Sequence, residues 1–155
     1  MAKLQTDLKE FIALLNSHGV EYLVVGGHAV AFHGHPRFTG DIDFLVRPTA
    51  ENAARVLAAM RDFGFGDLQL VAADFTTPER IVQLGRPPNR IDILTSISGV
   101  EFDEAWSDRI AAKLDEQAVH FLGFDTLIRN KKASGRDKDL ADVKTLIATA
   151  RRKRS

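Results

Sequence analysis

Hydrophobic side chains recur at two spacings along the chain, and the change from one spacing to the other predicts the order of its elements. Near the N-terminus apolar residues return every three or four positions, which is typical of an amphipathic helix. This set comprises Leu4, Leu8, Phe11, Ile12 and Leu15. Thr6 or Asp7 can cap the start of the helix and Gly19 can end it. Residues 51–63 repeat the pattern before Gly64, so they predict another long helix.

Short apolar runs indicate the strands. Residues 22–25 form a run that ends at Gly26-Gly27 and leads into a short helix up to Gly34, which gives a strand, a glycine turn and a helix. Further strands are predicted over residues 41–46, 68–71, 80–84 and 90–94, with another pair over 110–114 and 118–121. The sequence GRPPN at residues 85–89 connects two of these strands in the manner of a hairpin.

Two helices are predicted toward the C-terminus. The first begins at Asp125 and is broken at Gly135, and the second begins at Asp137, because aspartate is a favourable N-cap. The apolar stripe expected to be buried in the second helix is Leu140, Val143, Leu146 and Ile147. Helices alternating with strands, followed by several strands and two closing helices, predict an α/β protein with a mixed β-sheet and flanking helices.

Length and composition fit one domain, expected over residues 1–150, with a basic tail at 151–155. The 21 basic and 21 acidic residues cancel, so contacts with nucleic acid would be local rather than drawn by a global positive field. The lack of cysteine excludes disulfides, thiolate nucleophiles and zinc–thiolate sites. The chain has neither a run of 18 apolar residues nor an apolar leader, so we expect a cytoplasmic protein without a membrane partner.

Two carboxylates stand two residues apart in a strand that is otherwise apolar. Asp41 and Asp43 project from one face of such a strand, while Ile42 and Phe44 face the other way. The Cα atoms of the two acids lie about 6.6 Å apart, at roughly 3.3 Å of rise per residue. Because paired catalytic ions lie about 3.5 to 4 Å apart, these two side chains can converge on one or two divalent cations.

A third acid, Asp92, stands within the run Ile-Asp-Ile-Leu of residues 91–94, which favours burial. Burying an unpaired carboxylate costs several kcal/mol or shifts its pKa until the group is neutral, so this side chain needs a partner. One possible partner is a cation held jointly with the first two acids, in the oxygen-only environment that Mg²⁺ prefers, if the two strands lie side by side. The alternative is an ion pair with Arg90 or Arg37.

Gly26 and Gly27 stand at the junction of a strand and a helix. Glycine lets the backbone approach an anion closely, and a helix N-terminus offers unpaired N–H groups to a phosphate. Without neighbouring acids the same pair is typical of an ordinary strand-to-helix turn. Together with three carboxylates it predicts a site for phosphate and metal.

These motifs resemble the signature of the nucleotidyltransferase superfamily related to DNA polymerase beta. That signature is an apolar residue, Gly, then Gly or Ser, and, after a spacer, Asp-x-Asp or Asp-x-Glu between apolar residues. Residues 25–27 (Val-Gly-Gly) and 41–44 (Asp-Ile-Asp-Phe) fit it, and Asp92 fits its separate third acid. More narrowly, residues 26–46 and 127–146 look like the small bacterial proteins grouped with the AbiEii-type nucleotidyltransferases of toxin–antitoxin systems.

The resemblance implies the minimal nucleotidyltransferase fold and the transfer of a nucleoside monophosphate from a nucleoside triphosphate to a hydroxyl. Asp41 and Asp43 would hold Mg²⁺ or Mn²⁺, and Asp92 would hold one ion and accept the proton of the attacking hydroxyl. Contacts with the nucleotide would come from Gly26, Gly27, His28, Arg37, Thr39, Lys132 and Arg136. Gly27 stands where the superfamily often has Ser, which leaves only the backbone at that position to contact phosphate.

The basic residues near the C-terminus have two interpretations. The helix that carries Lys131, Lys132 and Arg136 could close over the triphosphate, oriented by Asp139 or Asp142. Lys131 and Lys132, like the basic cluster at 151–154, are also typical of a solvated helix face or tail, and a local RNA-contacting patch is the sharper alternative.

The sequence thus predicts a Mg²⁺-dependent enzyme that uses a nucleoside triphosphate and a protein, RNA or small-molecule acceptor, with a toxin or antitoxin as a candidate partner. The alternatives are a non-catalytic, antitoxin-like partner protein of the same fold and a nucleotide-binding regulator that has lost turnover.

Overall fold

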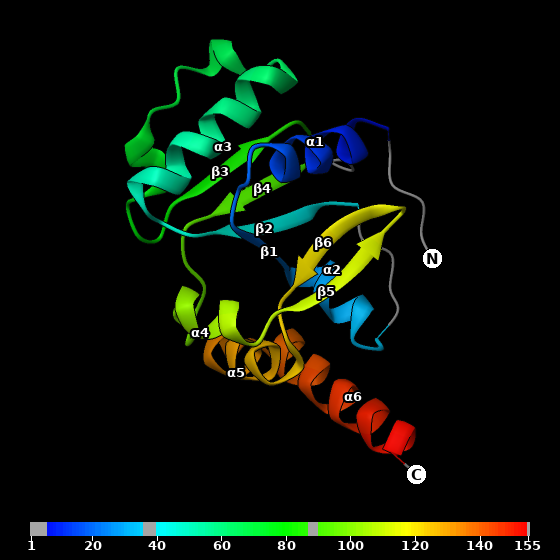
Figure 1. Cartoon of the computed structure of the whole chain (residues 1–155). Coiled ribbons are helices and arrows are strands. Elements are labelled where there is room, and N and C mark those ends of the chain that lie inside the picture. The colour runs from blue at the N-terminus through cyan, green and yellow to red at the C-terminus, as the bar shows by residue number, and fades with distance from the viewer. Residues whose placement is uncertain (1–5, 36–39, 87–89, 155) are drawn as a thin grey trace.

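The computed structural model describes residues 6–35, 40–86 and 90–154. Within these ranges six strands form one mixed sheet in the order β3-β4-β2-β1-β6-β5 (Figure 1). The strands are β1 (Tyr22–Val25), β2 (Ile42–Val46), β3 (Ile81–Leu84), β4 (Ile91–Leu94), β5 (Ile110–Leu114) and β6 (Gln117–Phe121). The pairs β1–β6 and β2–β4 are parallel, and the pairs β1–β2, β3–β4 and β5–β6 are antiparallel. The mixed sheet and flanking helices predicted from the sequence are therefore confirmed.

Helices cover both faces of the sheet. On one face lie α1 (Thr6–Ser17) and α3 (Ala50–Phe63), and on the other lie α2 (Gly26–Phe32), α4 (Phe102–Ser107) and α5 (Phe124–Ser134), while α6 (Asp137–Arg154) runs away from the body (Figure 1). Phe11 of α1 packs against Phe44 of β2, with ring centroids 5.9 Å apart, and Phe44 in turn meets Tyr22 of β1 at 5.4 Å. These rings show that Phe44 faces the α1 and α3 layer, so its neighbours Asp43 and Leu45 face the opposite layer.

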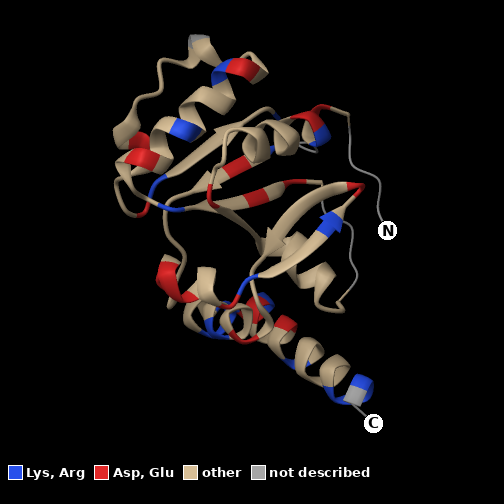
Figure 2. Cartoon of the chain, viewed as in Figure 1, with Lys and Arg blue, Asp and Glu red and all other residues tan. Residues whose placement is uncertain are grey.

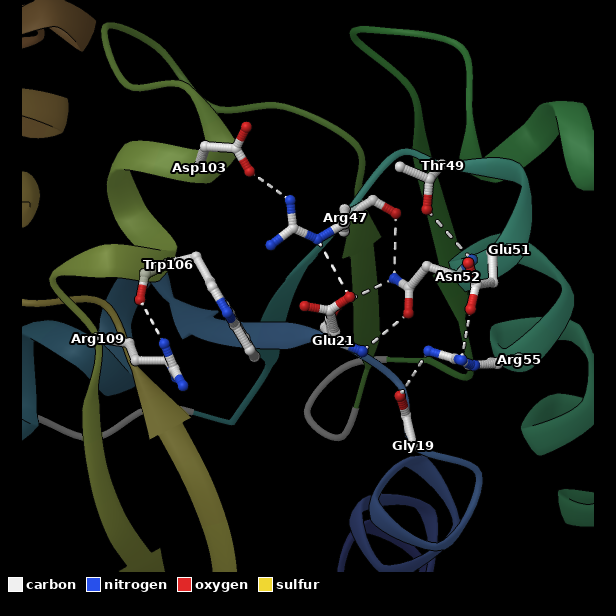
Figure 3. Close-up of polar contacts among 10 residues, drawn as sticks. All are labelled: Gly19, Glu21, Arg47, Thr49, Glu51, Asn52, Arg55, Asp103, Trp106 and Arg109. Carbon is white, nitrogen blue, oxygen red and sulfur yellow. Dashed lines mark hydrogen bonds and ion pairs between the residues drawn. The ribbon is translucent and has the colours of Figure 1, made fainter.

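A buried amide holds the ends of β1 and β2 in register (Figure 3). The Asn52 side chain, 1% exposed, accepts a hydrogen bond from the Glu21 backbone N–H at 2.8 Å and donates to the backbone carbonyls of Glu21 and Arg47, each at 3.0 Å. Thr49 caps α3 by accepting from the Asn52 backbone N–H. Arg47 also pairs with Glu21 and Asp103, which ties α4 to the same end of the sheet. The register set here carries through to Val25 and Asp43 at the far end of the pair.

The predicted strand over residues 68–71 is wrong. The chain instead forms two short 3₁₀ helices, η1 (Gly66–Leu68) and η2 (Ala72–Phe75). Leu68 and Val71 are 49% and 56% exposed, so this apolar run does not mark a buried strand. Gln69 has a φ of 56°, in the left-handed region, which turns the chain where a strand would have to stay extended.

Three details of the helices also differ from the prediction. Gly123, not Asp125, is the N-cap of α5, and Asp125 lies in its first turn, where an acidic side chain still favours the helix dipole. Leu140, predicted in the buried stripe of α6, is 42% exposed, whereas Val143 and Leu146 of that stripe are buried. The basic residues predicted as a tail continue α6 as far as Arg154. None of the helices in the described ranges combines the length and apolar character needed to cross a membrane.

Candidate active site

Strand pairing brings the predicted acids together. β2 and β4 are parallel neighbours, and Asp43 lies directly opposite Asp92 in the register. Adjacent strands are about 4.8 Å apart, so the two residues present their side chains to the same face at close range. Asp41 directly precedes β2, and its Oδ1 accepts a hydrogen bond of 3.1 Å from the backbone N–H of Arg90, directly before β4. The side-by-side arrangement that a joint site requires is present.

The glycine turn lies against the same carboxylates. β1 ends opposite Asp43, because Val25 is its partner in the antiparallel register. Gly26 follows with a φ of +65°, and a Cβ added to it would lie 2.1 Å from Oδ2 of Asp43. Only glycine meets both demands at this position, the left-handed backbone and the lack of a side chain. The turn and the acids therefore form one surface.

Burial and like charge act on Asp43. Burial, together with the neighbouring Asp92 and Asp41, raises the pKa of this carboxyl to about 6, and Arg90 acts in the opposite direction. Asp92 itself is 8% exposed. A cation near these oxygens would relieve both the desolvation and the repulsion.

Arg90 occupies the space among the acids. Its Nε lies 2.9 Å from Oδ1 of Asp92 and its Nη2 lies 3.2 Å from Oδ2, which makes a two-pronged ion pair. The same Nη2 is 3.5 Å from Oδ2 of Asp41. The ion pair with arginine, considered above as the alternative for Asp92, is thus present together with the clustering of the three acids. Among the described residues no group of three or more His, Cys, Asp or Glu side chains is arranged to hold a metal ion.

A cleft of about 620 Å³ lies over Asp43 and Asp92. Its floor comes from the strands, and its wall comes from α5, the start of α6 and the loop after β4. The lining residues include Gly26, Asp43, Asp92, Ile81, Ser96, Asn130, Lys131 and Arg136. The volume falls within the range of small-molecule sites.

A buried ion-pair cluster fixes the turn between α5 and α6. The Nζ of Lys131 lies 3.2 Å from Asp139 and 3.2 Å from Asp142, and all three side chains are buried. Arg136 donates from Nε to Asp139 at 2.7 Å while its own side chain stays 70% exposed. Burial alone would raise the pKa of Asp139, but hydrogen bonds from Arg136 and Lys131 hold it below its usual range. The cluster sets the wall of the cleft at a fixed distance from the sheet.

A family model described as a nucleotidyltransferase of unknown function (DUF6036) matches residues 2–150. The chain belongs to this family. No curated protein matches the sequence.

Two solved structures share the fold of this nucleotidyltransferase family member. A candidate nucleotidyltransferase from Thermotoga maritima is similar with a TM-score of 0.59 at 15% identity, over 91% of this chain and 90% of that one. An antigenic nucleotidyltransferase-like protein from Paracoccidioides brasiliensis is similar with a TM-score of 0.54 at 18% identity, over 95% of this chain and 78% of that one. Both likenesses support the nucleotidyltransferase fold, and the narrower AbiEii-type likeness stays a prediction.

The predicted nucleotide contacts are distributed unevenly around the cleft. Gly26 and Arg136 line it, whereas Lys132 is exposed and is not among its lining residues. His28 is half-buried in the first turn of α2, where burial lowers its pKa and a hydrogen bond with the backbone of Asp41 opposes that shift. Gly27 follows Gly26 in the same turn. Arg37 and Thr39 lie outside the described residues.

Two residues, Lys131 and Arg90, have contacts at the site that the sequence did not predict in full. Lys131, rather than its neighbour Lys132, faces the cleft, and its position four residues after the buried Leu127 is the signal for that orientation. Arg90 stands two residues before Asp92, which places both on the same face of a strand. That spacing indicated the pair, but not its contact with Asp41.

Proposed function

We propose that this protein transfers a nucleoside monophosphate from a nucleoside triphosphate to a hydroxyl. The observation that carries the proposal is the register of β2 against β4, which sets Asp43 opposite Asp92 beside the glycine turn of Gly26. A buried Asp92 beside a half-buried Asp43 under an open cleft is costly for stability alone, since an apolar pair would pack there without charge repulsion.

The proposed chemistry forms one bond and breaks one. The acceptor oxygen attacks the α-phosphorus, the bond from that phosphorus to the oxygen bridging to the β-phosphorus breaks, and pyrophosphate leaves. The hydroxyl proton passes to a carboxylate of the site, which we assign to Asp92. The backbone at Gly26 and Gly27 lies close enough to the acids to hold the phosphates next to them.

The carboxylates suit a hard divalent cation in their chemistry. Oxygen donors alone favour Mg²⁺ or Mn²⁺ over softer metals, and Asp41, Asp43 and Asp92 would hold it. When bound, the ion would neutralise phosphate charge and activate the attacking oxygen. Arg90 now lies between these donors, so the fit requires its guanidinium to move.

The opposite wall supplies positive charge for the triphosphate. Arg136 lines the cleft with an exposed side chain, and Lys131 lies behind it, held by Asp139. We assign Arg136 to the phosphates and Lys131 to positioning of the wall. A protein or RNA acceptor, including a toxin or antitoxin partner, belongs to the same proposal because either can offer a hydroxyl.

The test uses labelled nucleoside triphosphates, Mg²⁺ and fractions of cellular protein and RNA. The wild type is expected to label an acceptor, and Asp43→Asn is expected to lose the signal. Asp103→Asn is the matched control, since Asp103 is exposed and pairs with Arg47 at the other end of β2. Equal labelling by the wild type and Asp43→Asn would contradict the proposal.

A non-catalytic nucleotide-binding protein is the second candidate. The Arg90–Asp92 pair favours it, because that pair engages the acid that should accept the proton. A protein of this second kind would bind nucleotide saturably as the wild type but would transfer no label to the fractions of cellular protein or RNA.

A further inference from the structure

The main chain and the side chain of Arg90 make two separate sets of contacts. Its backbone N–H donates to Asp41, and its backbone carbonyl accepts from the Ile42 N–H at 3.1 Å, so its main chain is fixed against the start of β2. The side chain is 29% exposed and pairs with Asp92. A fixed backbone with a partly exposed side chain lets the guanidinium leave without disturbing the strands.

The guanidinium engages the same oxygens that a divalent cation would need. It contacts both oxygens of Asp92 and one oxygen of Asp41, and no acidic cluster of the described residues is arranged for a metal ion while it does so. An arginine fork and a metal ion both bind a carboxylate through its lone pairs. They therefore compete for Asp92.

We propose that Arg90 is the built-in counter-ion of the three acids and that a divalent cation must displace its guanidinium from Asp92 in order to bind. This inference rests on the proposed function only in taking these acids as the metal site. Arg90 compensates the charge of the acids when the metal is scarce. It also raises the metal concentration at which the site is half-saturated.

The balance of charge in the cluster is consistent with an exchange. The three carboxylates carry three negative charges, of which the guanidinium compensates one, whereas a divalent ion in its place would compensate two. Arginine stays protonated at every relevant pH, so the exchange cannot proceed by loss of its proton. The guanidinium has to rotate away, toward solvent or toward the phosphates of a bound nucleotide.

The experiment measures thermal unfolding of the full chain against MgCl₂ or MnCl₂ alone, at constant ionic strength and without nucleotide. Arg90→Gln is expected to lower the half-saturating metal concentration about tenfold or more relative to the wild type, since a charge-assisted pair is removed as competitor. Without metal the same variant is expected to have a lower unfolding temperature than the wild type. Adding metal is expected to raise the unfolding temperature of the variant by more than that of the wild type. Arg55→Gln is the matched control, because it breaks an arginine–carboxylate pair with Glu51 on α3.

Two further variants, Arg90→Lys and the double variant Arg90→Gln with Asp43→Asn, test the competition between the guanidinium and the metal ion. Arg90→Lys keeps the charge but loses the fork, so a half-saturating concentration between those of wild type and Arg90→Gln is expected. Adding Asp43→Asn to Arg90→Gln should abolish the response to metal. Unchanged or weaker metal binding in both Arg90 variants, or no response to metal in any protein, would overturn the role of Arg90. Nucleotidyl transfer is measured in a separate assay. A failure of transfer is therefore distinguished from a failure of the predicted competition between Arg90 and the metal ion.

Discussion

At the scale of single residues, Gly26 and Asp43 depend on each other. The glycine has a left-handed φ, and the carboxylate occupies the space where its side chain would be. The raised pKa of Asp43 reports burial beside other acids rather than a lack of partners. Both features belong to a turn that serves a charged site.

Gly26→Ala is predicted to lower the free energy of unfolding by more than Gly19→Ala does. The two glycines have nearly equal φ values, +65° and +69°, but nothing lies within 4 Å of a Cβ added to Gly19. Backbone strain alone costs on the order of 1 kcal/mol in both, and the clash with Asp43 adds at least about as much in Gly26→Ala. Chemical denaturation measures the difference. Equal losses would show that Asp43 does not restrict this position.

Asp43 is also predicted to make stability depend on pH. Its folded pKa of about 6 lies above the ordinary 3.8, so the folded state binds the proton more tightly than the unfolded state. The stability contributed is therefore complete below about pH 4 and is lost as the pH rises through about 6. Asp43→Asn should be more stable than the wild type at pH 7 by on the order of 2 kcal/mol, and this advantage should shrink toward pH 4.

Urea unfolding in the presence of a chelator, from pH 4 to pH 7, provides the measurement. Asp103→Asn serves as the control, because it removes an exposed carboxyl at the other end of β2. Parallel pH profiles for Asp43→Asn and the wild type would refute the prediction.

At the scale of elements, the wall of the cleft depends on the turn between α5 and α6. Lys131 of α5 pairs with two buried acids of α6, so its loss leaves Asp139 with Arg136 as its cation and takes the lysine from Asp142. Lys131→Met is predicted to cost about 3–5 kcal/mol of stability, because removing one partner of a buried ion pair leaves the remaining buried charge poorly compensated.

Lys132→Met is the control for this cluster. Lys132 follows on the same helix but is exposed, so its loss should change stability by no more than about 0.5 kcal/mol. Thermal unfolding distinguishes the two variants. A small effect in both would mean that the ion pairs do not hold the turn.

The elements that could be predicted from sequence were those with strong local patterns. β1, β2 and β6 carry continuous or alternating apolar residues bounded by glycine or proline, and they lie where those patterns indicated. The run at 68–71 has the same appearance, but Leu68 has no core to pack against and stays exposed. Hydrophobic spacing also gave no indication of α4, whose Phe102 and Ala105 are buried by contacts distant in sequence.

In the candidate site, too, the features set by local sequence pattern could be predicted, and those set by the order of the strands could not. The common face of Asp41 and Asp43 follows from strand alternation within one segment, and so did its prediction. The pairing of Asp43 with Asp92 across about fifty residues, and the insertion of Arg90 between Asp41 and Asp92, depend on which strands become neighbours. Local pattern does not determine that order, so the salt bridge could only be considered as an alternative.

At the scale of the whole molecule, Asp43 and Asp92 of the sheet face Arg136 and Lys131 across the cleft. Acidic residues mark the central strands, and basic residues recur along α5 and α6 together with acidic ones, while the net charge of the chain is zero (Figure 2). The sheet side suits cations and the helical side suits phosphate, which matches the two halves of a metal-bound triphosphate. Attraction of the substrate would then be local, because the cancelled charges leave no long-range field.

The position of the label in the nucleoside triphosphate tests nucleotidyl transfer most directly. The reaction is run with the same triphosphate labelled either on the α-phosphate or on the γ-phosphate, with wild type and Asp43→Asn in parallel. For nucleotidyl transfer we expect the α-label to become attached to the acceptor, the γ-label to be released as pyrophosphate, and neither to happen with Asp43→Asn. Attachment of the γ-label, or no attachment of either label by the wild type, would contradict it.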